Sequence, residues 1–428
     1  MLLTNPEHSA QTSIEGLAYA SLRSQVREDL SKDREFLKSL VKTLESAPPK
    51  SPLTYGALSI IVNLTQYRPT QSEEQKRMNQ LKAYANAAGK LQSDTLNDDD
   101  RVTERCKRVF EAGVTPVLVT HSKNGSAASL SLIISIIYSL SRTPSLRGPL
   151  AQQGAVRLLI AAWTALPETA PSKEARRTAA QGLARILIST NPILVFGGTN
   201  PTPMSTAIRP LTSILLPDPN AETRDLLPTF EALMALTNLA STDDDTRHAI
   251  VRIAWEDVEE LLLSSNPRVT TAAVELVCNI VQSPSETIAL FGIDGSNVDK
   301  KSVAKAQNRL KILVALADAE DVATRSAAGG ALASLTAHES IVKAIALRQR
   351  GPEIVLGLCT DENEDLRHRG VFVVCNMVMA DGDAGKVARE KLRAAGAVEK
   401  LTECAKASRR RAVLEIAVQA IKALLEQN

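Results

Sequence analysis

The chain has 428 residues, of which 44% are hydrophobic and only 3% are aromatic. Its 50 basic and 48 acidic residues leave a net charge of +2, so no overall field draws it to nucleic acid or to an anionic membrane. A core poor in aromatic residues disfavours a β-rich fold, and this length also suits one continuous stack of helices filled by aliphatic side chains.

The sequence predicts a cytoplasmic protein that does not insert into membranes. Residues 1–10 show no basic stretch followed by an apolar run, so we expect no signal peptide. The most apolar stretch, residues 130–140, is interrupted by serine and is too short to span a bilayer. The five cysteines show no Cys-x-x-Cys spacing, which favours core thiols of a reducing compartment over disulfides or a metal site: Cys106, Cys278, Cys359, Cys375 and Cys404.

The first predicted helices cover residues 13–22 and a segment that ends at Leu44. Three prolines then separate them from an apolar helix that begins near Tyr55. Residues 66–101 lose this pattern; they are polar and contain one predicted helix, near residues 73–88. An insertion of this length is either a mobile surface loop or a functional one, and the sequence leaves both open.

A short phrase with glycine between two helical segments recurs along the chain. Gly113, Gly154 and Gly396 each follow a charged helix and precede an apolar one, and Gly351 marks a looser copy. Glycine at a helix end lets the chain turn sharply at no steric cost. Glycine at such turns is typical of armadillo repeats, in which a short first helix, a second helix and a long third helix form one unit. The third helix lines the concave side.

Residues 191–228 are rich in Pro, Gly and Thr and contain one short predicted helix, at residues 207–216. This stretch is the one candidate hinge. We expect it to divide a single solenoid, residues 1–428, into an amino-terminal part of about residues 1–195 and a carboxy-terminal part of about residues 196–428. The short Leu-rich helix is expected to stack into the same core, so two independent domains are not predicted.

One apolar helical pattern repeats along the chain, and its clearest copy is FEALMALTNLAS at residues 230–241. The apolar residues of this copy gather on one arc of a helix, and an amide lies off that arc. Four copies end in asparagine: Asn63, Asn238, Asn279 and Asn376. Weaker copies end at Ser139, Ile186, Ser334 and Ala423. Most neighbouring copies are about 41 to 55 residues apart, as in helical arrays. The sequence therefore predicts an all-α, right-handed, armadillo- or HEAT-like solenoid with a concave groove.

The recurring asparagines are the candidate binding residues. At equivalent places on successive third helices, their amides would form a ladder of donors and acceptors for the main chain of an extended or partly unfolded segment. The alternative is that an asparagine caps a helix locally or is satisfied at an interface between helices, and for any single one it stays open. The predicted groove set also includes Ser334, which ends a weaker copy in the same register.

Three charged clusters favour structural roles. Asp243, Asp244 and Asp245 follow a third helix and predict a cap for the next helix, where negative charge is favourable. The run 409–411 is all arginine without interleaved aromatic residues, so it predicts a solvated face and no nucleic-acid site. The residues 367–369, Arg-His-Arg, precede a glycine-initiated apolar run and predict a solvated helix start.

The sequence gives no sign of catalysis. Gly385 and Lys386 lack the spacing and the preceding strand of a phosphate-binding loop. The five histidines lie on different repeats, away from any hydrolase motif, and the aspartate run lacks EF-hand spacing. We therefore expect no enzyme activity, no cofactor and no metal.

Five phrases occur in one order along nearly the whole chain: SIEGLAYASL from Ser13, AIRPLTSILLPD from Ala207, FEALMALTNLAS from Phe230, RLKILVALADAED from Arg309 continuing through TRSAAGGALASLT, and LRHRGVFVVCNMV from Leu366. Together they resemble the UCS domain, the myosin-binding armadillo domain shared by the metazoan muscle-myosin chaperone and its fungal counterparts. The insertion at residues 66–101 and the lack of a tetratricopeptide segment resemble the fungal branch.

The resemblance implies a co-chaperone that binds the motor domain of myosin and assists its folding. It thereby implies a role in actin-based processes such as cytokinesis, endocytosis and polarised growth, with Hsp90 or Hsp70 involved only indirectly. Arg369 joins the candidate groove because it lies in a prominent family phrase. The sequence makes no prediction about self-association.

Two alternatives stay open. One is a general armadillo scaffold that binds linear motifs of folded partners. The other is a nuclear-transport adaptor, in which tryptophan largely occupies the place four residues before each asparagine. Trp163 and Trp255 are the chain's two tryptophans, and neither lies there, so the adaptor is disfavoured.

Overall fold

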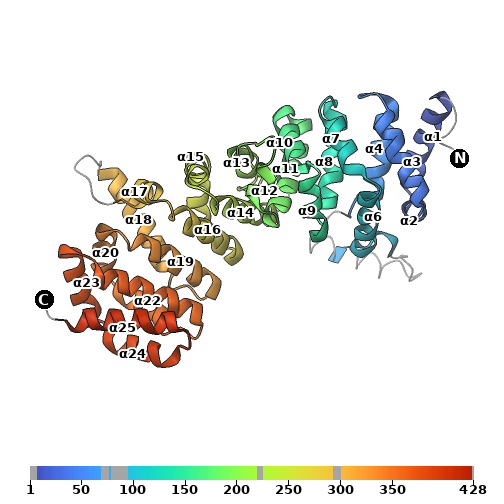
Figure 1. Ribbon diagram of the computed structural model, residues 1–428. Helices are drawn as coiled ribbons and strands as arrows, with labels where there is room; N and C mark the ends of the chain where they lie inside the picture. Colours follow the sequence, from blue (N-terminus) through green and yellow to red (C-terminus); the bar gives the residue numbers. More distant parts are fainter. Residues whose placement is uncertain (1–6, 69–76, 79–94, 219–224, 293–299, 427–428) are drawn as a thin grey trace. The chain divides into compact units, whose positions relative to one another are not determined.

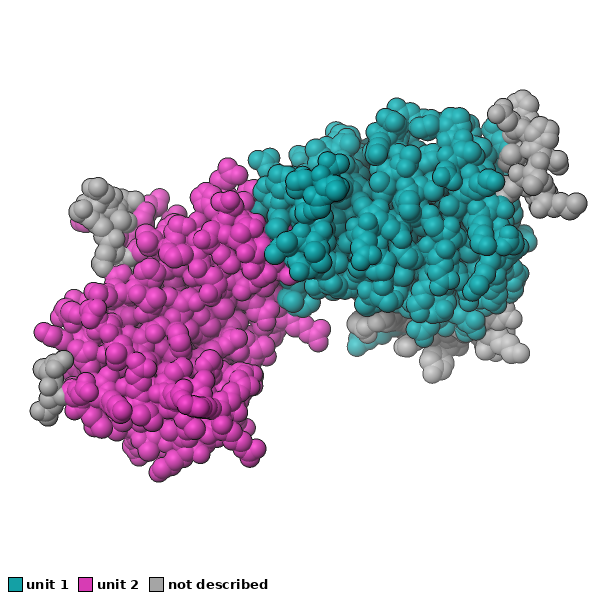
Figure 2. Space-filling model, viewed as in Figure 1, with its two compact units in different colours: residues 1–235 teal, residues 236–428 magenta. Residues whose placement is uncertain are grey.

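The computed structural model describes residues 7–68, 77–78, 95–218, 225–292 and 300–426, and over these residues all regular structure is helical. The chain forms two compact units, Met1–Ala235 and Leu236–Asn428 (Figure 2). The predicted all-α helical-repeat fold is confirmed. Of the helix expected near residues 73–88, the structure describes residues 77–78, which are helical, and the rest of it lies outside the described residues. The single-solenoid organisation with a division near residue 195 stays a prediction. No described helix is long and apolar enough to cross a bilayer.

The helices follow one another as first, second and third helices of successive repeats (Figure 1). The first helices are α2 (Ser24–Lys32), α6 (Asp99–Glu111), α9 (Pro144–Gln152), α12 (Pro192–Phe196), α17 (Pro284–Phe291), α20 (Glu339–Ala346) and α23 (Gly382–Ala394). The second helices are α3 (Arg34–Ser46), α7 (Val114–Ser122), α10 (Ala155–Ala165), α13 (Ser205–Thr212), α18 (Lys300–Leu316), α21 (Gly351–Cys359) and α24 (Ala397–Ala407). A single helix, α15 (Asp244–Leu261), takes both places in one repeat, and a 3-10 turn, η1 (Thr95–Asn97), precedes α6.

The third helices form the spine of each unit. They are α1 (Glu7–Ala20), α4 (Pro52–Thr65), α8 (Ala127–Ser141), α11 (Ala170–Ile188), α14 (Leu227–Ala240), α16 (Pro267–Ile280), α19 (Val322–Leu335), α22 (Glu364–Met379) and α25 (Arg411–Leu425). In the first unit α1 packs on α4, α4 on α8, and α8 on α11; in the second unit α16, α19, α22 and α25 pack in the same sequential way.

Helix α16 shows how the sequence makes such an element. The side chain of Asn266 caps it by accepting from the backbone N–H of Arg268, and Pro267 occupies its first turn. Most of its apolar residues are buried, including Val274 and Leu276. A narrow strip with Glu275 and Asn279 is only half-buried. The helix is therefore apolar nearly all round and shows one edge to solvent, as its sequence predicts.

Glycine makes three of the turns between first and second helices. Gly113, Gly154 and Gly396 have φ angles of 86°, 90° and 80°, in the left-handed region that favours glycine. The prediction was wrong at the fourth copy. There Arg350 takes the left-handed conformation, with φ of 61°, because Gly351 is already the first residue of α21.

Helices α21 and α22 approach each other closely at Gly370. A Cβ atom at this position would lie 2.7 Å from the backbone nitrogen of Cys359 and 2.8 Å from the carbonyl carbon of Leu358. These are backbone atoms, which cannot move aside as a flexible side chain can. Glycine therefore sets the distance between the second and third helices in this repeat.

A buried arginine joins the helices of the amino-terminal repeats. Arg105 of α6 is fully buried and donates to the carbonyl oxygens of Leu64 at 2.9 Å and Leu96 at 2.6 Å. It also donates to Asn97 Oδ1 at 3.1 Å and lies 3.5 Å from a carboxylate oxygen of Glu28. The guanidinium thus ties the end of α4 to the segment that enters α6 and to α2.

Candidate functional site

The four asparagines that the sequence singles out all lie near the carboxy-terminal ends of third helices, and all are half-buried. Asn63 lies on α4 in the first unit. Asn238, Asn279 and Asn376 lie on α14, α16 and α22 in the second unit. None of the four is fully buried in the core. Their recurrence in the sequence therefore corresponds to recurrence of one structural position on the helices.

Three of these side chains donate to the preceding third helix. Asn63 Nδ2 donates to the carbonyl oxygen of Ala18 at 3.2 Å and to a serine hydroxyl at 2.9 Å. Asn279 Nδ2 donates to the carbonyl oxygen of Thr237 at 2.9 Å. Asn376 Nδ2 donates to the carbonyl oxygen of Ala333 at 3.0 Å and to a threonine hydroxyl at 3.2 Å. Each amide thus donates to a carbonyl in the last turn of its neighbour. These carbonyls also accept from their own helix ends: Ala18 from the Ser21 hydroxyl, Thr237 from the Ser241 N–H and Ala333 from the Thr336 hydroxyl.

The side-chain oxygens of the same asparagines, unlike the nitrogens, have no partner among the described residues. Within the described residues, the Oδ1 atoms of Asn63, Asn279 and Asn376 accept no hydrogen bond, although each residue is half-exposed. A carboxamide with its N–H₂ engaged and its oxygen open can accept from a donor outside the chain. The hydrogen bond to the neighbouring third helix fixes the orientation of each amide and leaves its oxygen available as an acceptor.

Ser334 of α19 belongs to the same row in the second unit. Its hydroxyl accepts from Gln282 Nε2 at 2.8 Å, and the same amide donates to the carbonyl oxygen of Cys278 at 3.1 Å. Gln282 thereby links the end of α16 to α19. Gln282 lies beyond the apolar repeat pattern, so no sequence signal points to it.

Arg369 crosses from α22 to α19 instead of pointing freely to solvent. Its Nη1 donates to the carbonyl oxygen of Ser326. A Cβ atom on Gly330 would lie 2.9 Å from Arg369 Nη1 and 2.9 Å from the Sγ of Cys278. The missing side chain of Gly330 thus leaves a notch in α19, into which the guanidinium from α22 and the thiol from α16 both reach.

Charges from neighbouring helices meet at this notch. Burial raises the pKa of the Glu275 carboxyl, and the positive charge of Arg369 acts in the opposite direction. Burial likewise raises the pKa of the Cys278 thiol, again opposed by Arg369 and reinforced by Glu275. The sequence signal for this cluster is the pair Gly329-Gly330 inside a helix, which is unfavourable unless something packs closely there.

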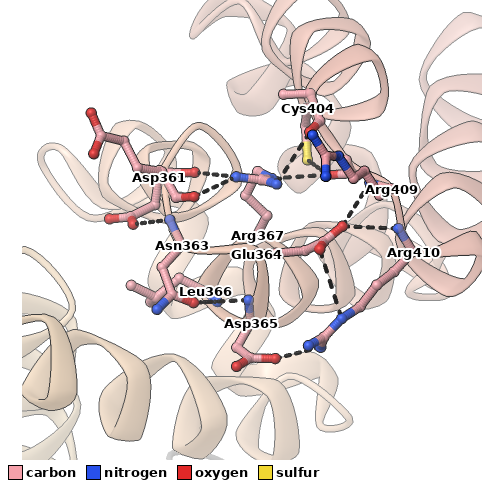
Figure 3. A network of polar contacts seen from close by, with 12 residues as sticks. Asp361, Asn363, Glu364, Asp365, Leu366, Arg367, Cys404, Arg409 and Arg410 are labelled. Carbon is pink, nitrogen blue, oxygen red and sulfur yellow. Dashed lines mark hydrogen bonds and ion pairs between the residues drawn. The ribbon is translucent and has the colours of Figure 1, made fainter.

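Arg367 is not a solvated helix-start residue, and that prediction was wrong. The side chain is buried, with 7% of its surface exposed. It donates to the hydroxyl of Ser408 at 2.9 Å and to the carbonyl oxygens of Asp361 and Glu362 at 2.8 and 2.9 Å (Figure 3). The helix begins three residues earlier than the cluster, so Arg367 already faces the next repeat.

The arginine run at residues 409–411 is held by carboxylates of α22. Glu364 Oε1 accepts from the backbone N–H groups of Arg409 at 2.7 Å and Arg410 at 2.8 Å (Figure 3). These backbone hydrogen bonds hold the pKa of Glu364 below its ordinary value. The guanidinium of Arg410 pairs with Asp365. Glu364 therefore caps α25 from the preceding repeat, and the side chains of the run lie at the surface as expected.

A second polar cluster that the sequence analysis missed lies on the third helices of the first unit. Arg185 of α11 pairs with Glu231 of α14, with 2.8 Å between Nε and Oε1, and both residues are buried. Gln181 donates to the other oxygen of Glu231 at 2.7 Å. The guanidinium of Arg185 also lies 4.4 Å from the ring centre of Tyr138 on α8. The cluster joins three neighbouring third helices.

The remaining motifs behave as structural elements. Asp243 caps α15 by accepting from the N–H of Thr246 at 2.7 Å, as predicted. All five cysteines are free thiols, and four of them are buried, as predicted for core thiols. Burial raises the pKa of Cys106 to about 12, so this thiol stays protonated at neutral pH. Among the described residues, no group of three or more His, Cys, Asp and Glu could hold a metal ion.

Known proteins share the fold of this chain and part of its sequence. No family model matches it. It is 32% identical over 368 residues to ring assembly protein 3 of Schizosaccharomyces pombe, a match that covers 85% of this chain and 47% of that protein. The solved structure of UNC-45 from Drosophila melanogaster superposes with a TM-score of 0.77 at 26% identity, over 98% of this chain and 50% of that one.

The structure of the myosin chaperone UNC-45 from C. elegans in complex with a Hsp90 peptide superposes with a TM-score of 0.78. At 20% identity, covering 99% of this chain and 43% of that one, it shows likeness of fold. The chain thus spans about half the length of the proteins that it matches, and what it shares with them is the helical-repeat part.

Proposed function

This chain belongs to the UCS-domain family, and on that premise we propose that it is a co-chaperone that binds the motor domain of myosin. The C. elegans relative is itself described as a myosin chaperone. The proposed action is to hold the motor domain while it folds and to keep it from aggregating. Its setting is the cytoplasm, where it supports actin-based processes such as cytokinesis, endocytosis and polarised growth.

The observation that carries the proposal is the orientation of the amides on the third helices. Asn279 and Asn376 donate from Nδ2 to the preceding third helix, and their Oδ1 atoms accept no hydrogen bond from the described residues. Such acceptors match the backbone N–H groups of an extended segment, which every sequence offers. A client that has not finished folding exposes such N–H groups, whereas a folded partner has mostly satisfied them.

The exposed apolar surface beside the amides supports the same reading. Phe372 lies four residues before Asn376 on α22 and is 43% exposed. Met234 holds the equivalent place before Asn238, and Glu275 before Asn279, and both are half-buried. Third helices thus offer an aromatic, a thioether and a carboxylate beside the amides, a mixed surface suited to a varied segment of chain. We propose Asn63, Asn238, Asn279, Ser334, Arg369 and Asn376 as client-contacting residues.

We propose that the chain acts by binding its client, without catalysis. Hsp90 and Hsp70 are then involved indirectly, through their own action on the same client. Neither tryptophan favours a nuclear-transport adaptor. Trp255 packs edge-to-face against Phe291 with 6.4 Å between ring centres, and the ring of Trp163 lies 3.9 Å from the guanidinium of Arg176. Both rings belong to first and second helices, away from the amide row.

Suppression of heat aggregation tests the proposal. The purified chain should reduce light scattering from a heated myosin motor domain at a near-equimolar ratio, and should leave an unrelated heat-labile enzyme unprotected. Equal protection of both would indicate a general holdase. Tight binding of a short linear motif without any protection of the motor domain would favour the general scaffold instead. ATP hydrolysis by the pure chain would contradict a role limited to binding.

A further inference from the structure

A cavity in the second unit is lined by residues of first and second helices and by none of the third-helix amides. It is an open cavity with a volume of about 590 Å³, lined by α18, α20, α21 and the turn between α20 and α21. None of the residues that line it is acidic, and three are cationic: Lys311, Arg348 and Arg350. Its apolar lining includes Val314, Leu347 and Ile354.

Arg348 is held in this cavity without a carboxylate. Its Nε is buried and has no hydrogen-bond partner within the described residues. One Nη atom reaches the carbonyl oxygen of Gln307, at a long 3.4 Å. Burial lowers the pKa of this guanidinium, and no neighbouring charge acts against that effect. A partly desolvated cation without an anionic partner is unfavourable, and an anion from outside the chain would compensate it.

The other two cations are also poorly matched by the chain itself. Lys311 is exposed and forms no ion pair in the part of the chain that the structure describes. Arg350 pairs with Asp318 at 3.2 Å, but both side chains are exposed, and such surface pairs hold little energy. The cavity therefore keeps a net positive charge.

The backbone at Arg350 is a third, independent observation. The equivalent turns elsewhere in the chain place Gly113, Gly154 and Gly396 in the left-handed region. Here an arginine adopts that conformation, with φ of 61°, although glycine would do so without strain. A strained residue at a cavity wall calls for a functional reason, and a guanidinium aimed at a ligand would supply one.

We propose that this cavity binds a linear segment of a partner protein that carries acidic side chains next to an apolar one. The three cations match the carboxylates. A cavity of this volume with an apolar wall formed by Leu347, 58% exposed, and Ile354 is larger than a lone inorganic anion needs and has room for an aliphatic side chain. The site lies on different helices from the amide row, so its occupation does not depend on the proposed myosin-binding role.

Fluorescence anisotropy with the full chain tests this proposal. The probe is a fluorescein-labelled peptide in which leucine alternates with glutamate, and the control probe has glutamine in place of glutamate. The chain should bind the first probe, more weakly as salt is raised, and should not measurably bind the second. Arg348→Gln and Lys311→Gln should each weaken binding by about tenfold, whereas Lys305→Gln, an exposed change elsewhere on α18, should not.

Arg350→Gly separates a binding role from a structural one. Glycine relieves the backbone strain, so the variant should keep or raise the Tm while losing about tenfold in peptide affinity. A lower Tm would mean that the arginine is there for stability and would contradict the proposal. So would full displacement of the probe by an equal concentration of inorganic phosphate, which would assign the cavity to small anions. Absence of binding by the unaltered chain, or equal loss in Lys305→Gln, would also overturn it.

Discussion

Asn376 donates a hydrogen bond from its side-chain nitrogen to the carbonyl oxygen of Ala333 in the last turn of α19, at 3.0 Å. The same geometry joins Asn279 to Thr237 and Asn63 to Ala18. These three asparagine amides therefore link successive third helices, and their oxygens accept no hydrogen bond from the described residues. On the proposed function, in which the oxygens of these amides contact the client, stability and client binding are coupled at these positions.

Asn376→Ala removes hydrogen bonds to Ala333 and to the hydroxyl of Thr336. Because each net hydrogen bond contributes about 1 kcal/mol, the free energy of unfolding should fall by about 1 to 2 kcal/mol in chemical denaturation. Gln419→Ala on α25 is the matched control, since Gln419 is an exposed amide and should change stability by no more than about 0.5 kcal/mol. Equal stability of both variants would show that the linkage contributes nothing.

Asn376→Asp keeps the shape of the side chain but, once ionised, removes both donors. At neutral pH the carboxylate would face the carbonyl oxygen of Ala333, so we expect a larger loss of stability than in Asn376→Ala. A protonated carboxyl can donate one hydrogen bond, so the difference from the unaltered chain should shrink as pH falls through the pKa of the new acid. A pH-independent difference would contradict the assignment of Nδ2 as the donor.

Gly370→Ala should be strongly destabilising, because its Cβ would lie 2.7 Å from the backbone nitrogen of Cys359. Forcing α21 and α22 apart should cost about 2 kcal/mol or more, by analogy with overpacked cores. Gly357→Ala is the control on α21, because a Cβ there meets nothing within 4 Å and the helix should gain about 0.5 to 1 kcal/mol. Thermal unfolding of the two variants should move in opposite directions. A Gly370→Ala variant as stable as the unaltered chain would refute the close approach.

The pairing of Glu28 with the buried Arg105 predicts that the free energy of unfolding depends on pH. Burial works to raise the pKa of Glu28, but Lys32 and Arg105 outweigh it and hold that pKa below its ordinary value of 4.5. A lowered folded-state pKa means that the stabilisation is fully present above pH 4.5 and is lost as pH falls through the folded value. Urea denaturation between pH 7 and pH 3 should show this loss, and it should be smaller in Glu28→Gln, which cannot titrate there.

Arg105→Met removes the cation beside the buried carboxylate of Glu28. It also removes the donor of three hydrogen bonds. Removing one partner of a buried pair should cost about 3 to 5 kcal/mol at neutral pH. Lys107→Met is the control, since Lys107 is a more exposed cation on the same helix and pairs with Glu104 on the surface. Similar stability of the two variants would show that the Arg105 network adds little.

The repeat pattern was enough to predict the fold, because every third helix must bury the same faces and so repeats the same apolar positions, as α14 and α16 do. It also located the asparagines correctly at helix ends. What it could not predict was the direction of each amide, which depends on a carbonyl some 40 residues earlier in the chain. Arg367 was misassigned for the same reason, since its partner Ser408 belongs to the next repeat. Local patterns record which residues recur, whereas contacts between repeats decide where their polar atoms point.

The most direct test of the central claim is the affinity of this chain for a myosin motor domain when one exposed third-helix residue is removed. Phe372→Ala should leave folding intact, since the side chain is 43% exposed, and should weaken binding by about tenfold if the third helices contact the client. Ile288→Ala on α17, which removes a 61% exposed apolar side chain from a first helix, should leave affinity unchanged. Unchanged binding by Phe372→Ala, or equal loss by Ile288→Ala, would contradict the account.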